Sequence, residues 1–227
     1  MTGNEKEEKV YKVFETIADG YDDANDRISL GMQKGWKKNL IAVMHDKASV
    51  LDVCTGTGDI ALAIRSENPD TQVTGLDFSP AMLDVAKTKA GADQITWIEG
   101  DATALPFDDE SFDGVTISFG LRNTPDYKKV ILEIKRVLKP GGVFACLDSF
   151  VPENGFVKAF YGIYFGGIMP ILGGASAHKD EYLWLNESTK SFLSPTELKA
   201  LMIECGYRDV SVTKMMMGAC CLHKGVK

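Results

Sequence analysis

Residues 50–61 combine an apolar run, two closely spaced glycines and the start of a helical pattern, Val-Leu-Asp-Val-Cys-Thr-Gly-Thr-Gly-Asp-Ile-Ala. Gly56 and Gly58 lack the Cβ atoms that would keep a ligand away from the backbone. The helix that follows begins with N–H groups that have no partner inside the helix. The stretch therefore predicts the floor of a nucleotide-type cofactor site.

Three carboxylates indicate which cofactor this site would bind. The glycine spacing, with Asp77 nineteen residues after Gly58, also satisfies the dinucleotide fingerprint. S-adenosylmethionine is favoured because Asp52 lies inside the strand, Asp101 forms a second acidic turn, and no nicotinamide half is evident. This donor has no pyrophosphate and needs acceptors, which Asp77 offers to the ribose hydroxyls and Asp101 to the adenine amino group. Each carboxylate taken alone is equally explained as a turn or cap residue.

Short β-type runs and helical runs alternate from Ala48 onward, which predicts an α/β fold. We expect a doubly wound, mostly parallel seven-stranded sheet with helices on both faces. Ligands bind beyond the carboxyl ends of such strands, where the glycine turn, Asp77, Asp101 and Ser118 all fall. The predicted strands are residues 49–54, 72–76, 95–98, 113–119, 142–149, 207–213 and 216–222, and the predicted helices are 58–66, 80–90, 127–138 and 194–204.

The residues before and after this alternation are expected to cover the site. Residues 5–19 have the apolar spacing of an amphipathic helix that packs as a lid, and a second helix is expected over 33–44. The polar, turn-rich residues 20–31 either clasp a ligand or form a solvated connector. Residues 152–193, rich in glycine, aromatic residues and methionine, either cover a substrate or form a helical pair packed on the core.

A single domain is predicted from these segments. Its parts are an N-terminal lid (1–47), a donor-binding core (48–150), an acceptor-covering insertion (151–193) and a C-terminal helix with strands (194–227).

Composition narrows the class of partner. The net charge of −7 and the pI near 5.1 argue against a nucleic-acid partner, because the linear sequence shows no basic patch. The five cysteines have no CxxC spacing and are expected to be buried thiols in a reducing compartment. The polar N-terminus favours a cytoplasmic protein, and the apolar stretch 155–174 is too broken by Lys158, Pro170 and six glycines to predict a membrane span.

Several motifs resemble one family. The chain is similar to class I S-adenosylmethionine-dependent methyltransferases, and among them to the ubiquinone/menaquinone biosynthesis C-methyltransferases of the UbiE/MenG type. The glycine turn and the run Val-Leu-Lys-Pro-Gly-Gly are shared by many methyltransferases, whereas the first and fifth of the following stretches are particular to the quinone-ring enzymes. The matching stretches are residues 14–31, 50–59, 75–79, 100–107, 118–125, 137–142 and 182–192.

The resemblance implies a position for each part of the methyl donor. It places Thr57 in the glycine turn, Asp77 at the ribose, Asp101 and Ala102 at the adenine, and Ser118 at the end of the fourth strand. The full predicted cofactor-binding set is Asp52, Gly56, Thr57, Gly58, Asp77, Phe78, Asp101, Ala102 and Ser118.

The reaction implied is C-methylation of the reduced ring of a prenylated quinone, either demethylmenaquinol to menaquinol or the ubiquinone-pathway equivalent. The ring carbon becomes nucleophilic when the neighbouring phenol loses its proton, which calls for a base or a stabilising cation. Arg122 is the candidate cation, directly or through a water, with Asn123 to orient it; the alternative is a salt bridge that ties its loop to an acid. Further catalytic candidates are Asp148, Tyr21 and His178. No metal is needed.

Three positions depart from the family pattern: Trp184 replaces a usual tyrosine, Asn186 a common proline and Asp148 a usual glutamate. They flank the expected acceptor pocket, so the donor is better specified than the acceptor. A prenylated acceptor would explain the apolar stretch 155–174, which would hold its tail or touch the inner face of the membrane. The sequence leaves the formation of a homodimer open.

Three rival functions remain at this point. The first is a methyltransferase for another small phenol, amine or sterol-like molecule. The second is a non-catalytic S-adenosylmethionine-binding regulator. The third is an NAD-dependent oxidoreductase, because the glycine spacing alone permits it.

Overall fold

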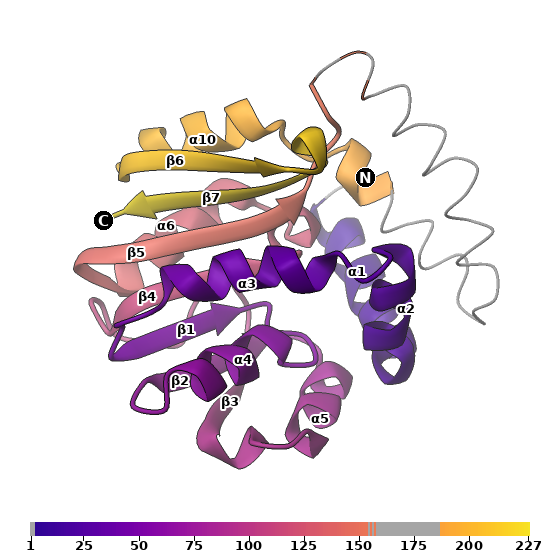
Figure 1. Ribbon diagram of the computed structural model, residues 1–227, viewed down its shortest axis with the longest axis vertical. Coiled ribbons are helices and arrows are strands. Elements are labelled where there is room, and N and C mark those ends of the chain that lie inside the picture. The colour runs from indigo at the N-terminus through magenta and orange to yellow at the C-terminus, as the bar shows by residue number, and fades with distance from the viewer. Residues whose placement is uncertain (1–2, 154, 156, 158–186) are drawn as a thin grey trace.

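The computed structural model describes residues 3–153, 155, 157 and 187–227. Within them, seven strands form one sheet in the order β3-β2-β1-β4-β5-β7-β6 (Figure 1). Strand β7 runs antiparallel to both of its neighbours and every other pair is parallel, so the predicted mostly parallel, seven-stranded sheet is confirmed. The strands are β1 Ser49–Val53, β2 Gln72–Asp77, β3 Ile95–Glu99, β4 Phe112–Ser118, β5 Leu138–Ser149, β6 Arg208–Met215 and β7 Cys220–Val226.

Helices cover both faces of this sheet. Figure 1 shows α3 and α4 on one face and α6 on the other. The longer helices of the described residues are α1 Gly3–Ile17, α2 Tyr21–Ile28, α3 Gln33–Val43, α4 Asp59–Glu67, α5 Pro80–Thr88, α6 Tyr127–Val137 and α10 Pro195–Glu204. Single 3₁₀ turns lie at η1 Ala18–Gly20, η2 Ala92–Gln94, η3 Leu121–Asn123 and η5 Met216–Gly218.

Apolar clusters lie on both faces of the sheet, because successive side chains of a strand point to opposite faces. On β5, Phe144 and Cys146 join the core cluster that contains α6 and α10, whereas Ala145 and Leu147 join the cluster that contains α3 and α4. All four side chains are completely buried. A strand that is apolar on both faces fits a sheet with helices on both sides.

Helix starts follow the capping residues in the sequence. The side chain of Ser79 accepts a hydrogen bond from the backbone N–H of Met82 at 3.2 Å and begins α5, with Pro80 at the first helical position. Ser194 and Glu197 form a reciprocal capping box at the start of α10. The helix starts predicted at both Ser-Pro pairs are confirmed.

Helix α1 is held on α5. Its apolar side chains Val10, Val13, Phe14 and Ile17 form a buried cluster with Met82 of α5. In addition, the Glu15 carboxylate accepts from Ser79 Oγ at 2.7 Å and from the Ala81 N–H at 3.1 Å.

The prediction that residues 20–31 are turn-rich is wrong over most of their length. Residues Tyr21–Ile28 form helix α2, and a turn follows only at residues 29–32. Tyr21, Ala24 and Ile28 have helical spacing and pack, partly buried, against the apolar cluster of α1 and α5, but the helix has no fully buried residue and no side-chain cap. Its order comes from tertiary contacts, such as the edge-to-face packing of Tyr21 on Phe14.

Two strand boundaries also differ from the prediction. Strand β5 begins at Leu138, ahead of the glycine pair at 141 and 142, with an irregular register against β4. The last strand was placed four residues too early, at 216–222, because a continuous apolar run hid the turn η5. Met216 and Met217 adopt left-handed backbone angles there, with φ of +45° and +53°.

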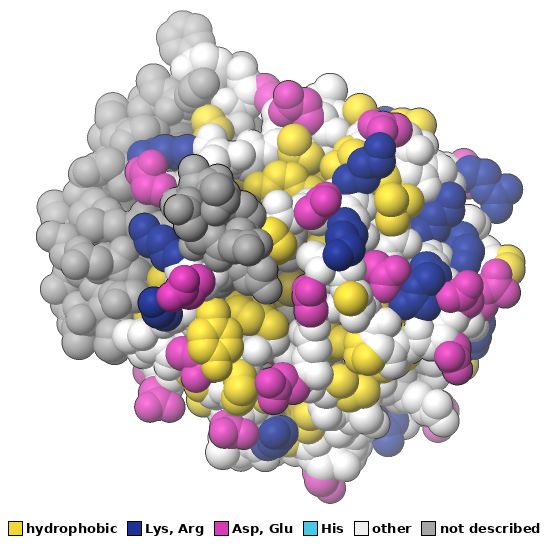
Figure 2. All heavy atoms as spheres, turned by 180° about the vertical axis from the view of Figure 1, so that it is seen from behind, with side chains coloured by type: hydrophobic (Ala, Val, Ile, Leu, Met, Phe, Trp, Pro, Cys, Tyr) yellow, Lys and Arg dark blue, Asp and Glu magenta, His cyan; other side chains and the backbone are white. Residues whose placement is uncertain are grey.

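Most of the 151–193 insertion, including the apolar stretch expected to bind a lipid tail, lies outside the described residues. In the part of the chain that is described, no helix is long and apolar enough to cross a bilayer. Lys, Arg, Asp and Glu side chains are interspersed on the face seen in Figure 2 and form no patch of one sign there.

Candidate active site

The two glycines of the turn between β1 and α4 have different neighbours. Gly56 has a φ of +55° and no atom within 4 Å of the position its Cβ would take, so its backbone borders open space. Gly58 has a φ of +81°, and a Cβ there would lie 2.5 Å from Cη2 of Trp97. Gly56 therefore leaves room for a ligand, whereas Gly58 allows α4 to pack closely on β3.

Asp77 at the end of β2 fixes this turn. One carboxylate oxygen accepts from the Gly56 N–H at 2.8 Å and the other from the Ser79 N–H at 2.9 Å. Burial raises the pKa of Asp77 to about 6, even though the N–H donors favour the charged form. The predicted meeting of Asp77 with the glycine turn is thus present at hydrogen-bond distance.

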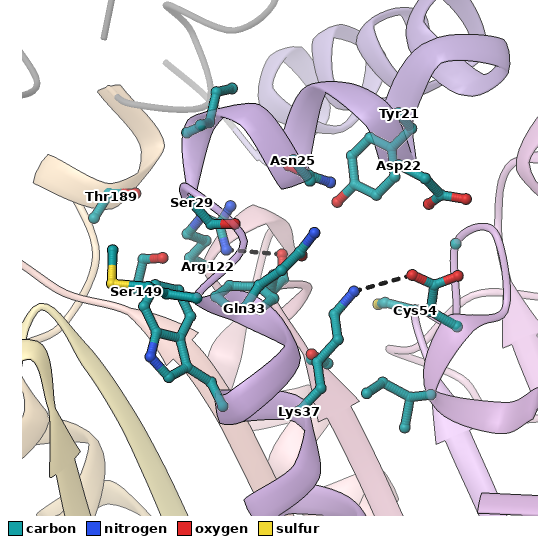
Figure 3. Close-up of a pocket in the computed structure, with 18 of the residues that line it drawn as sticks. Tyr21, Asp22, Asn25, Ser29, Gln33, Lys37, Cys54, Arg122, Ser149 and Thr189 are labelled. Carbon is teal, nitrogen blue, oxygen red and sulfur yellow. Dashed lines mark hydrogen bonds and ion pairs between the residues drawn. The ribbon is translucent and has the colours of Figure 1, made fainter. Parts of the chain in front are cut away.

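Two adjoining cavities open beside the turn, with volumes of about 90 and 310 Å³. The smaller is lined by Asp77, Phe78, Asp101, Ala102 and Asn123 among others. The larger is bordered by α2, by α3 and by the sheet edge, and Figure 3 shows Asn25, Lys37 and Arg122 pointing into it. The residues that line both cavities are Tyr21, Cys54, Gly56, Ser118 and Phe119.

The far end of the smaller cavity is formed by the loop after β3. The Asp101 carboxylate accepts from the backbone N–H of Thr103 at 2.7 Å and from the Thr103 hydroxyl at 2.5 Å. This is the geometry expected if Asp101 is a turn residue. Each carboxylate oxygen still has acceptor capacity. Asp101 is exposed and lines the cavity, so it is both a turn residue and available to a ligand.

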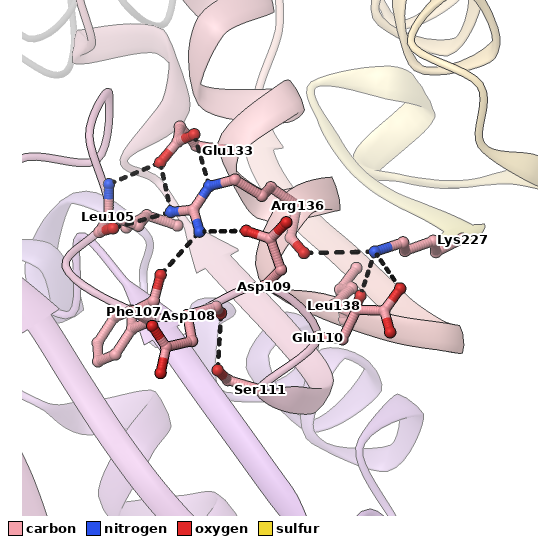
Figure 4. A network of polar contacts seen from close by, with 10 residues as sticks. All are labelled: Leu105, Phe107, Asp108, Asp109, Glu110, Ser111, Glu133, Arg136, Leu138 and Lys227. Atoms are coloured by element: carbon pink, nitrogen blue, oxygen red, sulfur yellow. Dashed lines mark hydrogen bonds and ion pairs between the residues drawn. The ribbon is translucent and has the colours of Figure 1, made fainter.

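This loop is fastened to α6 by one arginine. Arg136 donates to the backbone oxygens of Leu105 and Phe107 and to the carboxylates of Glu133 and Asp109, at 2.7 to 2.9 Å (Figure 4). These carboxylates raise the pKa of Arg136 further above its already high value. The loop that carries Asp101 is therefore held by a permanent cation.

Two buried polar atoms at the cavities lack a partner among the described residues: Ser118 Oγ and Asn123 Oδ1. A buried polar atom without a partner is costly unless a water or ligand satisfies it. Ser118 lines both cavities and Asn123 lines the smaller one. Together with the open space at Gly56 and the acceptors Asp77 and Asp101, these atoms fit a ligand that has hydroxyl and amino donors.

Arg122 lines the larger cavity and is itself buried. Its Nη1 donates to Asp148 Oδ1 at 2.5 Å and to the backbone oxygen of Phe119 at 2.8 Å, and the guanidinium lies 5.8 Å from the centroid of the Phe119 ring. The salt bridge considered as the alternative role of Arg122 is therefore present. Asp148 is completely buried and lies outside the lining of both cavities, behind Arg122.

The remaining predicted residues lie in distinct positions. Asp52 accepts from Thr55 and Thr116 hydroxyls at 2.6 Å, and burial raises its pKa to about 6. Tyr21 lines both cavities. Burial raises the pKa of Tyr21, although the positive charge of Arg122 opposes this shift, so the phenol stays protonated. Gly58 lines neither cavity, and His178 lies outside the described residues.

An ion-pair network that sequence reasoning missed joins α2 to the glycine turn. Thr57 Oγ1 donates to Asp22 Oδ1 at 2.6 Å, and Lys89 bridges Asp22 and Asp59 at 2.5 and 2.6 Å. Lys37 of α3 also contacts Asp59, at 3.1 Å. Asp22 belongs to a segment whose acid, amide and aromatic residues did suggest a clasp, whereas nothing in the sequence marked Lys89.

Comparison with known proteins identifies the family. A model of the ubiE/COQ5 methyltransferase family matches residues 2–227. The chain is 44% identical to a demethylmenaquinone methyltransferase of Staphylococcus epidermidis, over 98% of this chain and 94% of the relative, and 44% identical to one of Shouchella clausii, over 98% and 97%. An S-adenosylmethionine-dependent methyltransferase from Thermotoga maritima shares the fold, with a TM-score of 0.69, 18% identity, and coverage of 96% of this chain and 99% of that one. The chain belongs to the ubiE/COQ5 methyltransferase family.

Proposed function

We propose that this protein transfers a methyl group from S-adenosylmethionine to a ring carbon of a reduced, prenylated quinone, with demethylmenaquinol as the first candidate. The observation that carries the proposal is the pair of adjoining cavities that meet at the glycine turn, one with acceptors for a nucleoside and one with a buried cation. The names of the relatives at 44% identity support the acceptor class.

The donor would lie across the smaller cavity and the glycine turn. Asp77 would accept from the ribose hydroxyls, and Asp101 with Ala102 would hold the adenine, while Phe78 packs beside them. Gly56, Thr57 and Ser118 would border the amino-acid end, with Asp52 behind the turn. Gly58 would contribute through helix packing and not through contact with the donor. When bound, S-adenosylmethionine supplies an electrophilic methyl group on a sulfonium sulfur.

Residues of the larger cavity would activate the acceptor. Arg122 is permanently charged and lines this cavity, so it would stabilise the negative charge on the quinol oxygen next to the reacting carbon. Asp148 would act as a positioning residue, since it holds the guanidinium from behind. Tyr21, kept protonated, would donate a hydrogen bond and not act as a base, and Asn123 would orient the loop through its bond to the Phe119 oxygen at 3.2 Å. His178 remains a sequence-based candidate.

Closure of the site would exclude water. Helix α2 borders the larger cavity and is tied to the glycine turn by Thr57 and Asp22. Exclusion of water would strengthen the field of Arg122, and closure of the site would align donor and acceptor. Contact with the inner face of the membrane, where prenylated quinones reside, and formation of a homodimer are further parts of this proposal.

Mass spectrometry with an isotopically labelled methyl donor tests the proposal. Reduced demethylmenaquinone should gain one labelled methyl on a ring carbon, whereas transfer to an amine or to oxygen would favour a different methyltransferase. Tight donor binding without transfer to any quinol would indicate a regulator. Thermal stabilisation by NAD and not by S-adenosylmethionine would indicate an oxidoreductase, because only a true ligand stabilises the fold by mass action.

A further inference from the structure

Exposed apolar side chains gather in two turns of the described structure. Of its seven exposed large hydrophobic residues, four lie in the turn after α2 and in η5: Leu30, Met32, Met216 and Met217, with exposed fractions of 61%, 38%, 43% and 76%. Single exposed hydrophobic residues are ordinary, but a concentration in two turns requires an explanation.

Three of these residues also line the larger cavity: Met32, Met216 and Met217. A side chain that is both exposed and part of the cavity wall lies where the cavity meets solvent. The turn η5 is held at the end of β5, because Ser149 pairs with Cys220 and the Phe150 N–H donates to the Ala219 oxygen at 2.9 Å. The three methionines, which we term the methionine rim, therefore border the mouth of the cavity at the carboxyl edge of the sheet.

Three of the four exposed residues in these turns lie on strained backbone. Leu30, Met216 and Met217 have φ of +50°, +45° and +53°, in the left-handed region that costs a residue with a large side chain about 1 kcal/mol or more. Asparagine or glycine would avoid most of this cost. This chain nevertheless has long apolar side chains at these positions, which is the pattern expected when the side chains themselves are used.

The size and polarity of the cavity indicate what the rim contacts. The volume of about 310 Å³ lies at the low end for small-molecule sites, enough for a ring but not for a polyisoprenoid chain as well. The buried residues of its lining include Arg122, Asp52 and Thr57, which are polar or charged. An acceptor ring at the polar end would leave its chain pointing to the apolar mouth. Methionine side chains are flexible and polarisable, which suits contact with a mobile unsaturated chain.

We infer that the methionine rim is the exit and binding surface for the isoprenoid tail of the acceptor, and that it determines how strongly tail length affects KM. This inference rests on the proposed function, since it deepens the acceptor class of the same site. It assigns a role to Met216 and Met217, which the methyl transfer itself does not use.

The test compares two demethylated naphthoquinols, one with a single isoprene unit and one with a longer chain, in detergent. The variant is Met216→Asn with Met217→Asn, because asparagine tolerates left-handed angles and keeps the turn folded. We expect KM for the long-chain acceptor to rise about tenfold, the size expected when buried apolar contact with two side chains is lost, while KM for the short-chain acceptor and the affinity for S-adenosylmethionine stay unchanged.

The matched control is Leu132→Gln, which removes an exposed apolar side chain of α6 that does not line the cavity. It should change neither KM. Equal KM changes for both acceptors, or none, would overturn the inference while leaving the proposed function intact. Reduced binding to lipid vesicles with both KM values unchanged would instead make the rim a membrane contact, and would also overturn it. A wild-type protein that methylates neither acceptor would remove the proposed function first.

A labelling experiment gives a readout that does not depend on turnover. A long-chain acceptor that carries a photoreactive diazirine on one of the isoprene units nearest the ring should label residues of η5 or the turn at 29–32. Labelling confined to α6 or α10 would contradict the inference.

Discussion

Arg122 and Asp148 form a buried ion pair in which Nη1 lies 2.5 Å from Oδ1, and only Arg122 reaches the cavity. The Asp148 carboxylate also accepts from the Arg122 backbone N–H at 3.3 Å, so it binds both ends of the same residue. The structural and catalytic interpretations of Arg122 are therefore compatible, because the salt bridge holds a residue that lines the larger cavity.

Replacement of Arg122 by lysine should separate charge from geometry. Lysine keeps the positive charge but, as a point donor on a flexible stem, does not reproduce the contacts with Asp148 and the Phe119 oxygen together. We expect kcat to fall about 100-fold, as for loss of an oxyanion-stabilising donor, with the Kd for S-adenosylmethionine nearly unchanged. Arg65→Lys, on α4, is the matched control, because Arg65 lines neither cavity. An unchanged kcat in Arg122→Lys would rule out the proposed role.

Removal of Asp148 should damage the fold as well as the site. The variant Asp148→Ala leaves the Arg122 guanidinium buried beside an empty space, and an unpaired buried charge costs about 3–5 kcal/mol. The urea midpoint should fall accordingly. The double variant Arg122→Leu with Asp148→Leu should recover much of this stability and yet have no activity. Failure of the double variant to recover stability would show that the pair has further structural roles.

The fold was predictable from sequence wherever burial and capping act locally. The apolar run at residues 142–149 predicted most of β5, and the two Ser-Pro pairs predicted where α5 and α10 begin. The family prediction is confirmed over residues 2–227. Helix α2 was missed because its order depends on partners distant in sequence, such as Thr57 and Lys89. The turn η5 was missed because its left-handed methionines look like part of a strand.

Within the site, the sequence predicted which residues meet but not how each side chain is used. Asp77 and Gly56 were predicted at one sheet edge, and the Gly56 N–H donates to Asp77 Oδ2 at 2.8 Å. The separate uses of the two glycines depend on Trp97, which is far along the chain and carried no motif. Likewise, the sequence allowed a salt bridge between Arg122 and an acid, but no pattern identified Asp148 as that acid.

The two glycines of the turn offer a direct comparison. Gly58→Ala should lower the free energy of unfolding by about 2 kcal/mol, because the new methyl meets Trp97 and the φ of +81° is unfavourable for alanine. Gly56→Ala has only the backbone cost, about 1 kcal/mol, but its methyl would enter the cavity and should weaken S-adenosylmethionine binding about tenfold or more. Calorimetry and denaturant titration of both variants measure the two effects. Equal loss of affinity in both would contradict the assignment.

The contact between Thr57 and Asp22 should control closure of α2. Thr57→Val keeps the shape of the side chain but removes the hydroxyl that donates to Asp22 at 2.6 Å, a bond to a charged group worth about 1.5–3 kcal/mol. We expect faster proteolysis within residues 18–32 and a higher Kd for the donor. Thr88→Val, which removes an exposed hydroxyl bonded only to its own helix, is the control. Proteolysis at the control rate would show that α2 does not depend on this contact.

The raised pKa of Asp77 predicts how donor binding depends on pH. Burial raises this pKa from 3.8 to about 6, so between these values the folded protein binds more protons than the unfolded chain. The contribution of Asp77 to stability is therefore fully present below pH 3.8 and is lost as the pH rises through about 6. Donor binding has the opposite sign, because the ionised carboxylate is the better acceptor for two ribose hydroxyls.

The Kd for S-adenosylmethionine should accordingly be constant above pH 7 and rise up to about tenfold per pH unit below 6. Calorimetry in two buffers of different ionisation enthalpy should detect proton release on binding near pH 6. Asp77→Asn should bind the donor weakly and release fewer protons on binding than the wild-type protein, whereas Asp113→Asn, at the opposite end of the sheet, should keep the wild-type profile. Because the Asp52 pKa is also raised to about 6 and the two acids interact, the titration belongs to the pair. A flat affinity profile in the wild-type protein would show that Asp77 does not bind the donor as a carboxylate that titrates in this range.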